Sequence, residues 1–201
     1  MLNHRRAPLI FLCALLISSL CSRPDAFGQV NAPVPAQSGH NQKQGGRTMS
    51  FALQSTAFSN GGEIPRRFTC EGADLSPALS WDAVPAGAQS LALIADDPDA
   101  PVGTWTHWLI WNIPAHATAL PEGVAKTGSL DNGARQGVND FRRIGYGGPC
   151  PPPGKPHRYF FKLYALDARL DVKPGAGRGE LEAAMKGHVL SHAEFMGMYR
   201  R

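Results

Sequence analysis

Residues 91–113, LALIADDPDAPVGTWTHWLIWNI, decide the fold class of this chain. Residues 91–95 are a continuous apolar run, which is typical of a buried β-strand. Residues 107–113 alternate between two faces, and the pattern places on one face His107, Leu109, Trp111 and Ile113. Between the two runs lies an acidic loop that contains two prolines, at residues 96–101. The stretch therefore predicts two strands joined by a rigid, polar loop.

Other parts of the chain repeat these signals. Further strands are expected at residues 51–58, 157–165 and 193–199. One amphipathic helix is expected over residues 178–186, with Gly187 as its stop. The chain has 22 Gly and 17 Pro, which favours short strands and many loops over a helix bundle. These patterns predict a mainly β fold, a sandwich followed by a late helix.

The N-terminus has the features of an export signal. A basic start at residues 4–6 precedes an apolar run at residues 9–20, and the run is too short to span a bilayer comfortably. We predict a signal peptide over residues 1–28, a disordered linker over 29–50 and one domain over 51–201. A lipoprotein modified at Cys21 and an uncleaved anchor are the alternatives. All three place the domain outside the cytosol, in the periplasm or secreted.

Two of the four cysteines, Cys70 and Cys150, lie in the expected domain. Exported domains commonly form disulfides, so we predict a Cys70–Cys150 bridge. Two separate buried thiols are the alternative. The formal net charge is +4 and no Lys- or Arg-rich run occurs, so we expect a slightly basic soluble protein with no nucleic-acid partner.

Polar side chains gather where two of the expected strands begin. Asp97 and Asp99 precede the strand that starts at His107, and His157 and Tyr159 open another strand after a Gly/Pro-rich loop at residues 145–154. If both strands start at the same edge, these groups and free loop amides form a site for a phosphate or carboxylate. Each residue alone also has a simpler interpretation, as a turn former, a half-buried strand residue or a core residue.

The same motifs resemble the phosphatidylethanolamine-binding protein family, and the wider context resembles its bacterial Raf-kinase-inhibitor-like branch. The resemblance runs from about residue 51 to residue 201 and includes FTCEG (68–72), SPALSW (76–81), DPDAP (97–101), WNIP (111–114), YALD (164–167) and GHVL (187–190). It implies a sandwich of two antiparallel sheets with a C-terminal helix, one or two further short helices and a small cavity at one end. The ligand-binding residues that it implies are Asp97, Asp99, His107, Gly148, Pro149, His157 and Tyr159. Cys150 departs from the eukaryotic pattern, which usually has a second proline there.

The function that we expect is a non-enzymatic binding protein for a phosphate-like anion or a phospholipid head group, without a cofactor or a metal. The family includes regulators of kinases and inhibitors of proteases, so modulation of a partner protein, or an inhibitor-like module, is an alternative. A metal-dependent hydrolase using the Asp and His side chains is a further alternative. The sequence leaves the oligomeric state open.

Overall fold

The computed structural model describes residues 50–201. The predicted signal peptide and almost all of the predicted linker lie outside the described residues, so those two assignments stay predictions. Within residues 50–201, the structure contains no helix of the length and apolar character needed to cross a membrane.

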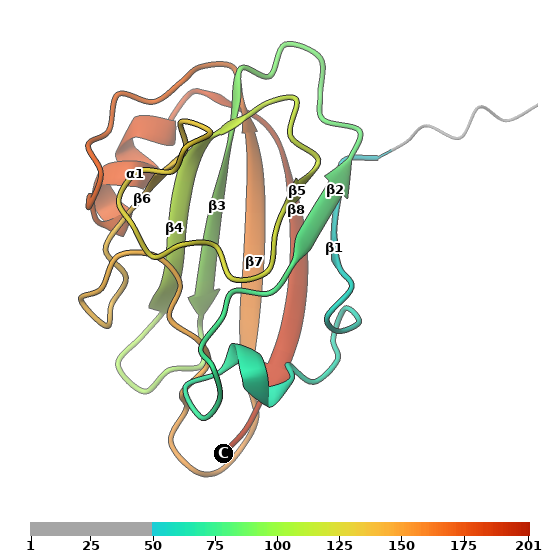
Figure 1. Cartoon of the computed structure of the whole chain (residues 1–201), viewed down its shortest axis with the longest axis vertical. Helices are drawn as coiled ribbons and strands as arrows, with labels where there is room; N and C mark the ends of the chain where they lie inside the picture. The colour runs from blue at the N-terminus through green and yellow to red at the C-terminus, as the bar shows by residue number, and fades with distance from the viewer. Residues whose placement is uncertain (1–49) are drawn as a thin grey trace, which may run out of the picture. The chain divides into compact units, whose positions relative to one another are not determined.

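The described residues form two antiparallel sheets, which confirms the predicted fold class (Figure 1). The smaller sheet has the order β1–β2–β5, with bounds Ala52–Ser55, Leu79–Asp82 and Ala119–Leu120. The larger sheet has the order β6–β4–β3–β7–β8, with bounds Arg135–Gln136, Trp105–Pro114, Ser90–Asp97, His157–Leu166 and Val189–Tyr199. A short 3₁₀ helix, η1, spans Arg66–Phe68, and an α-helix, α1, spans Arg178–Met185.

The larger sheet is buried on both faces, which explains the continuous apolar run in β3. Leu91 and Leu93 point into the core between the sheets, where they join Trp81 and Phe161. The alternate residues of β3 belong to a second cluster, on the face covered by α1, which contains Ala92, Ile94, Leu109, Trp111, Leu181 and Met185. A strand with two buried faces needs apolar side chains at every position.

The expected alternation along residues 107–113 is wrong at both ends of the strand, because β4 contains two irregularities. The pairing with β3 passes from Trp108 to Thr106 and skips His107, which is the signature of a β-bulge. As a result His107 packs against Tyr159 of the inter-sheet core, whereas Leu109 packs on the α1 side. A bulge can redirect a side chain in this way, and here it turns His107 toward the end of the sheets.

The second irregularity lies at Asn112, whose φ of 55° is unusual for a residue other than glycine. Its side-chain amide donates to the carbonyl of Leu170 at 2.9 Å and accepts from the amide of Leu170 at 2.8 Å. The irregular backbone places Ile113 in the inter-sheet core rather than on the face of Trp111. The local cost of this conformation is therefore offset by two buried hydrogen bonds.

The predicted helix is confirmed, and Gly187 follows it with a φ of 85°, a conformation that glycine adopts without strain. The strand expected over residues 51–58 is shorter, because only Ala52–Ser55 pairs with β2. The predicted strand at the C-terminus begins earlier, at Val189.

The topology brings the predicted polar residues to one end of the molecule. β3 ends at Asp97, and its neighbours β4 and β7 begin at Trp105 and His157. Because the three strands are adjacent and antiparallel, the end of β3 lies beside the starts of the other two. In Figure 1 this is the lower end, where the C-terminus also lies.

Candidate functional site

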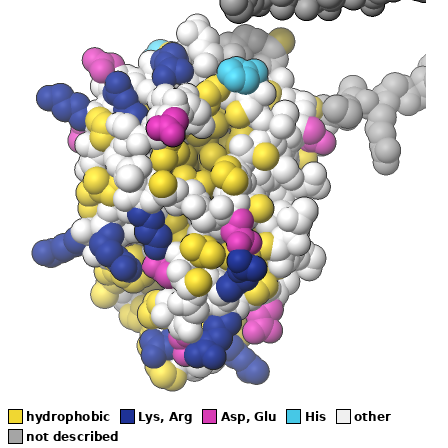
Figure 2. Space-filling model, viewed as in Figure 1, with side chains coloured by type: hydrophobic (Ala, Val, Ile, Leu, Met, Phe, Trp, Pro, Cys, Tyr) yellow, Lys and Arg dark blue, Asp and Glu magenta, His cyan; other side chains and the backbone are white. Residues whose placement is uncertain are grey.

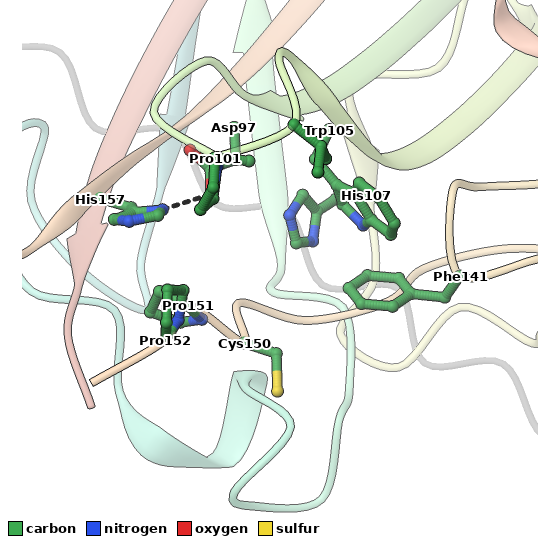
Figure 3. A pocket seen from close by; sticks show the side chains of 11 residues that line it. Asp97, Pro101, Trp105, His107, Phe141, Cys150, Pro151, Pro152 and His157 are labelled. Atoms are coloured by element: carbon green, nitrogen blue, oxygen red, sulfur yellow. Dashed lines mark hydrogen bonds and ion pairs between the residues drawn. The ribbon is translucent and has the colours of Figure 1, made fainter. Parts of the chain in front are cut away.

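A pocket of about 190 Å³ lies at this end of the larger sheet. Its polar lining comes from Asp97 at the end of β3, His107 on β4 and His157 at the start of β7 (Figure 3). The structure thus brings together three of the predicted site residues from three neighbouring strands. The volume suits a small group, since pockets for drug-sized ligands are larger, at about 300–1,000 Å³.

His157 and Asp97 form a hydrogen-bonded pair in the wall of the pocket. The Nδ1 atom of His157 lies 2.8 Å from Oδ2 of Asp97, and both side chains are largely buried. The other carboxylate oxygen, Oδ1, accepts from the backbone amide of Asp99 at 2.8 Å. The carboxylate is therefore fixed by two donors. With Nδ1 of His157 used in this bond, Nε2 is the ring nitrogen that remains for a ligand.

His107 differs from His157 in the partner of its ring. Its Nδ1 lies 2.6 Å from the carbonyl oxygen of Gly147, so Nδ1 carries the proton and donates. Burial lowers the pKa of His107, and the hydrogen bond to Gly147 and the charge of Asp97 only partly oppose this effect. The partner of Nδ1 of His107 is therefore a backbone carbonyl and not a carboxylate. Its neutral form presents Nε2 as an acceptor.

Tyr159, a predicted site residue, is not among the pocket-lining residues, but it has a buried hydroxyl and packs against His107. Its ring packs edge-on against the ring of His107, with 5.2 Å between centroids. Its hydroxyl is buried and has no hydrogen-bond partner among residues 50–201. Burial, and then the negative charge of Asp97, raises the pKa of Tyr159, so the group keeps its proton. A buried hydroxyl without a partner is costly, and a ligand oxygen would satisfy it.

Asp99, which the resemblance assigns to ligand binding, is not among the pocket-lining residues. Its Oδ2 accepts from the backbone amide of Arg158 at 3.0 Å and from Nε at 2.9 Å, and its Oδ1 accepts from Nη2 at 2.7 Å. The Arg158 guanidinium lowers the pKa of Asp99 to about 2, with burial opposing it. Asp99 thus acts as a partner for an exposed arginine and helps to hold the loop after β3.

Gly148 and Pro149 are also absent from the pocket lining. The amide of Gly148 donates to Oδ1 of Asp74 at 2.6 Å, and the amide of Gly147 donates to the carbonyl of His107 at 2.9 Å. The sequence suggested free loop amides for an anion, but both of these amides already have partners. A Cβ at Gly148 would lie 2.4 Å from the carbonyl oxygen of Phe68, so this glycine is needed where the loop approaches η1. Pro149 accepts from the amide of Cys70.

Apolar side chains that the prediction missed form the rest of the wall. They come from the loop after β3, the start of β4 and two later loops, and include Pro101, Trp105, Phe141, Pro151 and Pro152 (Figure 3). Trp105 could have been found, because it precedes His107 by two positions at the same strand end. Phe141 gives no local signal. Trp81 and Trp108 are buried in the core and do not line the pocket.

Apart from the two histidines, Asp97 is the one titratable acid or base among the residues that line this pocket. Among residues 50–201, no Lys or Arg lines the pocket. Figure 2 shows Lys and Arg side chains near the lower end of the molecule, mixed with Asp and Glu side chains. The described residues also hold no group of three or more His, Cys, Asp or Glu side chains that could bind a metal ion. The polar chemistry of the pocket is therefore that of two imidazoles, one carboxylate and a nearby phenol.

The predicted disulfide between Cys70 and Cys150 is confirmed. It connects the segment after η1 to the Gly/Pro-rich loop, and Cys150 itself lines the pocket. The bridge therefore joins two parts of the chain that lie 80 residues apart, at the edge of the candidate site.

Acidification is expected to destabilise the protein through His107. Because burial lowers the pKa of His107, the unfolded chain binds a proton at this residue more readily than the folded chain does. The stability associated with neutral His107 is present at pH 7 and is lost as the pH falls below the ordinary value of 6.5. Urea unfolding at pH 7 and pH 5 measures the effect. The wild type is expected to lose more stability over this interval than the His107→Gln variant. Equal losses would contradict a lowered pKa of His107 in the folded chain.

Comparison with known proteins agrees with the geometry. The profile of the phosphatidylethanolamine-binding protein family matches residues 54–200. The UPF0098 protein of Methanothermobacter thermautotrophicus is 56% identical over 149 residues, which cover 74% of this chain and 98% of the relative. A crystal structure of a phosphatidylethanolamine-binding protein homologue from Chlamydia trachomatis has 40% identity and a TM-score of 0.70, and covers 77% of this chain and 99% of that chain. The structure of YbcL from Escherichia coli has 36% identity and a TM-score of 0.71, with 75% and 98% covered.

Proposed function

Because the chain belongs to the phosphatidylethanolamine-binding protein family, we propose that it is a non-enzymatic binding protein for a phosphate group, either free or as part of a phospholipid head group. One observation carries the proposal. Two histidines, on the two strands that flank β3, have Nδ1 fixed by the protein and Nε2 left over in a pocket of about 190 Å³, and the tyrosine whose ring packs against one of them has an unpartnered hydroxyl.

The two histidines offer complementary hydrogen bonds to a phosphate. Nε2 of His157 is placed to donate to a phosphate oxygen, while Asp97 holds the opposite side of the ring. Neutral His107 accepts at Nε2, so it suits the P–OH group of a phosphate monoanion. The hydroxyl of Tyr159 is a second donor. The arrangement therefore favours an anion that still carries a proton.

Discrimination between phosphate and sulfate tests this proposal. Sulfate has the same shape but carries no proton at neutral pH, so it leaves Nε2 of His107 without a donor. We expect phosphate to bind the full chain about tenfold more tightly than sulfate at pH 6.5, measured by calorimetry. Absence of binding by both anions at millimolar concentration would overturn the proposed function.

A comparison of phosphoethanolamine with ethanolamine distinguishes a site for phosphate from a site for an ammonium group. We expect phosphoethanolamine to shift the NMR signals of His107 and His157, and ethanolamine alone to leave them unchanged. Shifts with ethanolamine alone would assign the pocket to the cation, through Asp97.

We also propose that the protein is exported, to the periplasm or outside the cell. The apolar segment at residues 9–20 supports this location, and so does the Cys70–Cys150 disulfide, because such bonds persist in oxidising compartments. Modulation of a partner protein, if it occurs, then concerns partners in the same compartment.

A further inference from the structure

The disulfide holds the part of the pocket wall that has few other connections. Cys150, Pro151 and Pro152 line the pocket, and Pro153 follows them. Proline has no amide hydrogen, so residues 151–153 cannot donate backbone hydrogen bonds. The next amide, that of Gly154, donates to the carbonyl of Arg201 at 3.3 Å. The segment depends on contacts at its two ends.

The upstream end of the wall is well fixed without the disulfide. The amide of Gly148 donates to Asp74, the hydroxyl of Tyr146 donates to the carbonyl of Phe68 at 2.8 Å, and the amide of Cys70 donates to the carbonyl of Pro149. These hydrogen bonds fix the loop only as far as residue 149. Beyond it, the Cys70–Cys150 bond and Arg201 are the contacts that hold the lining residues.

The environment of the bridge favours thiol–disulfide exchange in one direction. Cys70 is exposed, whereas Cys150 is partly buried in the pocket wall. Nη1 of Arg201 lies 3.9 Å from Sγ of Cys150 and 3.5 Å from the carbonyl oxygen of Pro151. A guanidinium at this distance stabilises a thiolate, so Cys150 is the better leaving group and Cys70 the more accessible target.

We propose that the Cys70–Cys150 bridge is an exchange site for an external dithiol and that its opening loosens the pocket and weakens anion binding. One thiolate of the dithiol attacks Sγ of Cys70, the S–S bond breaks, and the electron pair goes to Sγ of Cys150. The second thiol of the dithiol then displaces Cys70 from the mixed disulfide. The dithiol is oxidised to a disulfide, and its two protons end on the two cysteines of the protein. This inference rests on the proposed function, because anion affinity is its readout.

The first test compares the oxidised chain with the chain reduced by dithiothreitol, with inorganic phosphate as the probe at pH 6.5. Calorimetry is expected to show affinity about tenfold weaker after reduction, as expected when a preorganised wall becomes mobile. Affinity should return after reoxidation. Equal affinity in the two forms overturns this inference alone, whereas absence of binding in both forms overturns the proposed function as well. Far-UV circular dichroism must show that the reduced chain is still folded at the temperature of the titration.

Two variants extend the test. Cys70→Ser removes the bridge and keeps Cys150 in the pocket lining, so it should bind phosphate like the reduced chain and should not respond to dithiothreitol. Arg201→Gln removes the guanidinium next to Cys150 and should slow reduction of the bridge about threefold to tenfold. Alkylation followed by peptide mass spectrometry measures that rate separately from Cys13 and Cys21. An unchanged rate would overturn the role of Arg201.

Discussion

The His157→Ala variant is expected to bind inorganic phosphate about tenfold to a hundredfold more weakly than the wild-type chain at pH 6.5, because it loses a hydrogen bond to a charged group. The imidazole of His157 lies in the pocket with Nδ1 held by Asp97, so its loss removes a donor and leaves the carboxylate facing the anion. Both consequences oppose anion binding. Calorimetric titration measures the difference.

A second His–Asp pair in the same chain provides a matched control. Nδ1 of His188 lies 2.8 Å from Oδ1 of Asp167, the same distance as in the pocket pair, but both side chains are about half exposed and neither lines the pocket. His188→Ala removes a histidine with the same kind of partner and should leave phosphate affinity unchanged. If His157→Ala and His188→Ala behave alike, the pocket is not the anion site.

The His157→Ala variant should remain folded, so that its loss of affinity can be interpreted. Removal of His157 leaves Oδ2 of Asp97 without its partner, which costs about 1–3 kcal/mol. A domain of ordinary stability, with about 5–15 kcal/mol, tolerates this loss. Asp97→Asn is a gentler companion, because it keeps the shape of the side chain and removes its charge.

The fold could be predicted from the sequence because its longest strands carry strong local patterns. The run at residues 91–95 is apolar at every position, since β3 packs against the smaller sheet on one face and against α1 on the other. The short strands β2, β5 and β6 were not predicted. β5 and β6 have two residues each, and a period of two cannot be recognised in so short a segment.

The site could be predicted only in part, because strand alternation assumes regular strands. Asp97 and His157 follow from their place at strand ends. The orientation of His107 depends on a bulge in β4, and nothing in the local sequence marks it. Asp99 was assigned to ligand binding from its place in the loop after Asp97 and from the family resemblance, but Arg158, 59 residues later, binds its carboxylate. Such long-range partners become visible only in three dimensions.

The two histidines show how the environment divides one residue type into two roles. His157 has a carboxylate at Nδ1, whereas His107 has a backbone carbonyl at Nδ1 and is more deeply buried. The sequence presents both as histidines at the start of a strand and so suggests equal roles. Burial lowers the pKa of His107 and so favours a neutral acceptor there, and the function proposed above therefore expects a ligand that carries both charge and a proton.

The Gly148→Ala variant is expected to lose about 2–4 kcal/mol of unfolding free energy, from overpacking and a broken hydrogen bond. A Cβ at this position would lie 2.4 Å from the carbonyl oxygen of Phe68 and 2.8 Å from Cα of Thr69. Both are backbone atoms, so a rotamer change cannot relieve the overlap. The loop must move away from η1, which also stretches the hydrogen bond from the Gly148 amide to Asp74. Urea denaturation measures the loss.

This variant distinguishes a packing role for Gly148 from the ligand-binding role that the sequence suggested. If Gly148 packs the loop against η1, Gly148→Ala lowers stability, and Asp74→Ala, which removes the acceptor of the same amide, lowers it in the same direction. Gly179→Ala is the control, because a Cβ there meets no atom within 4 Å and alanine favours the helix by up to about 1 kcal/mol. A Gly148→Ala chain of wild-type stability that has lost phosphate affinity would instead show that Gly148 contacts the anion directly.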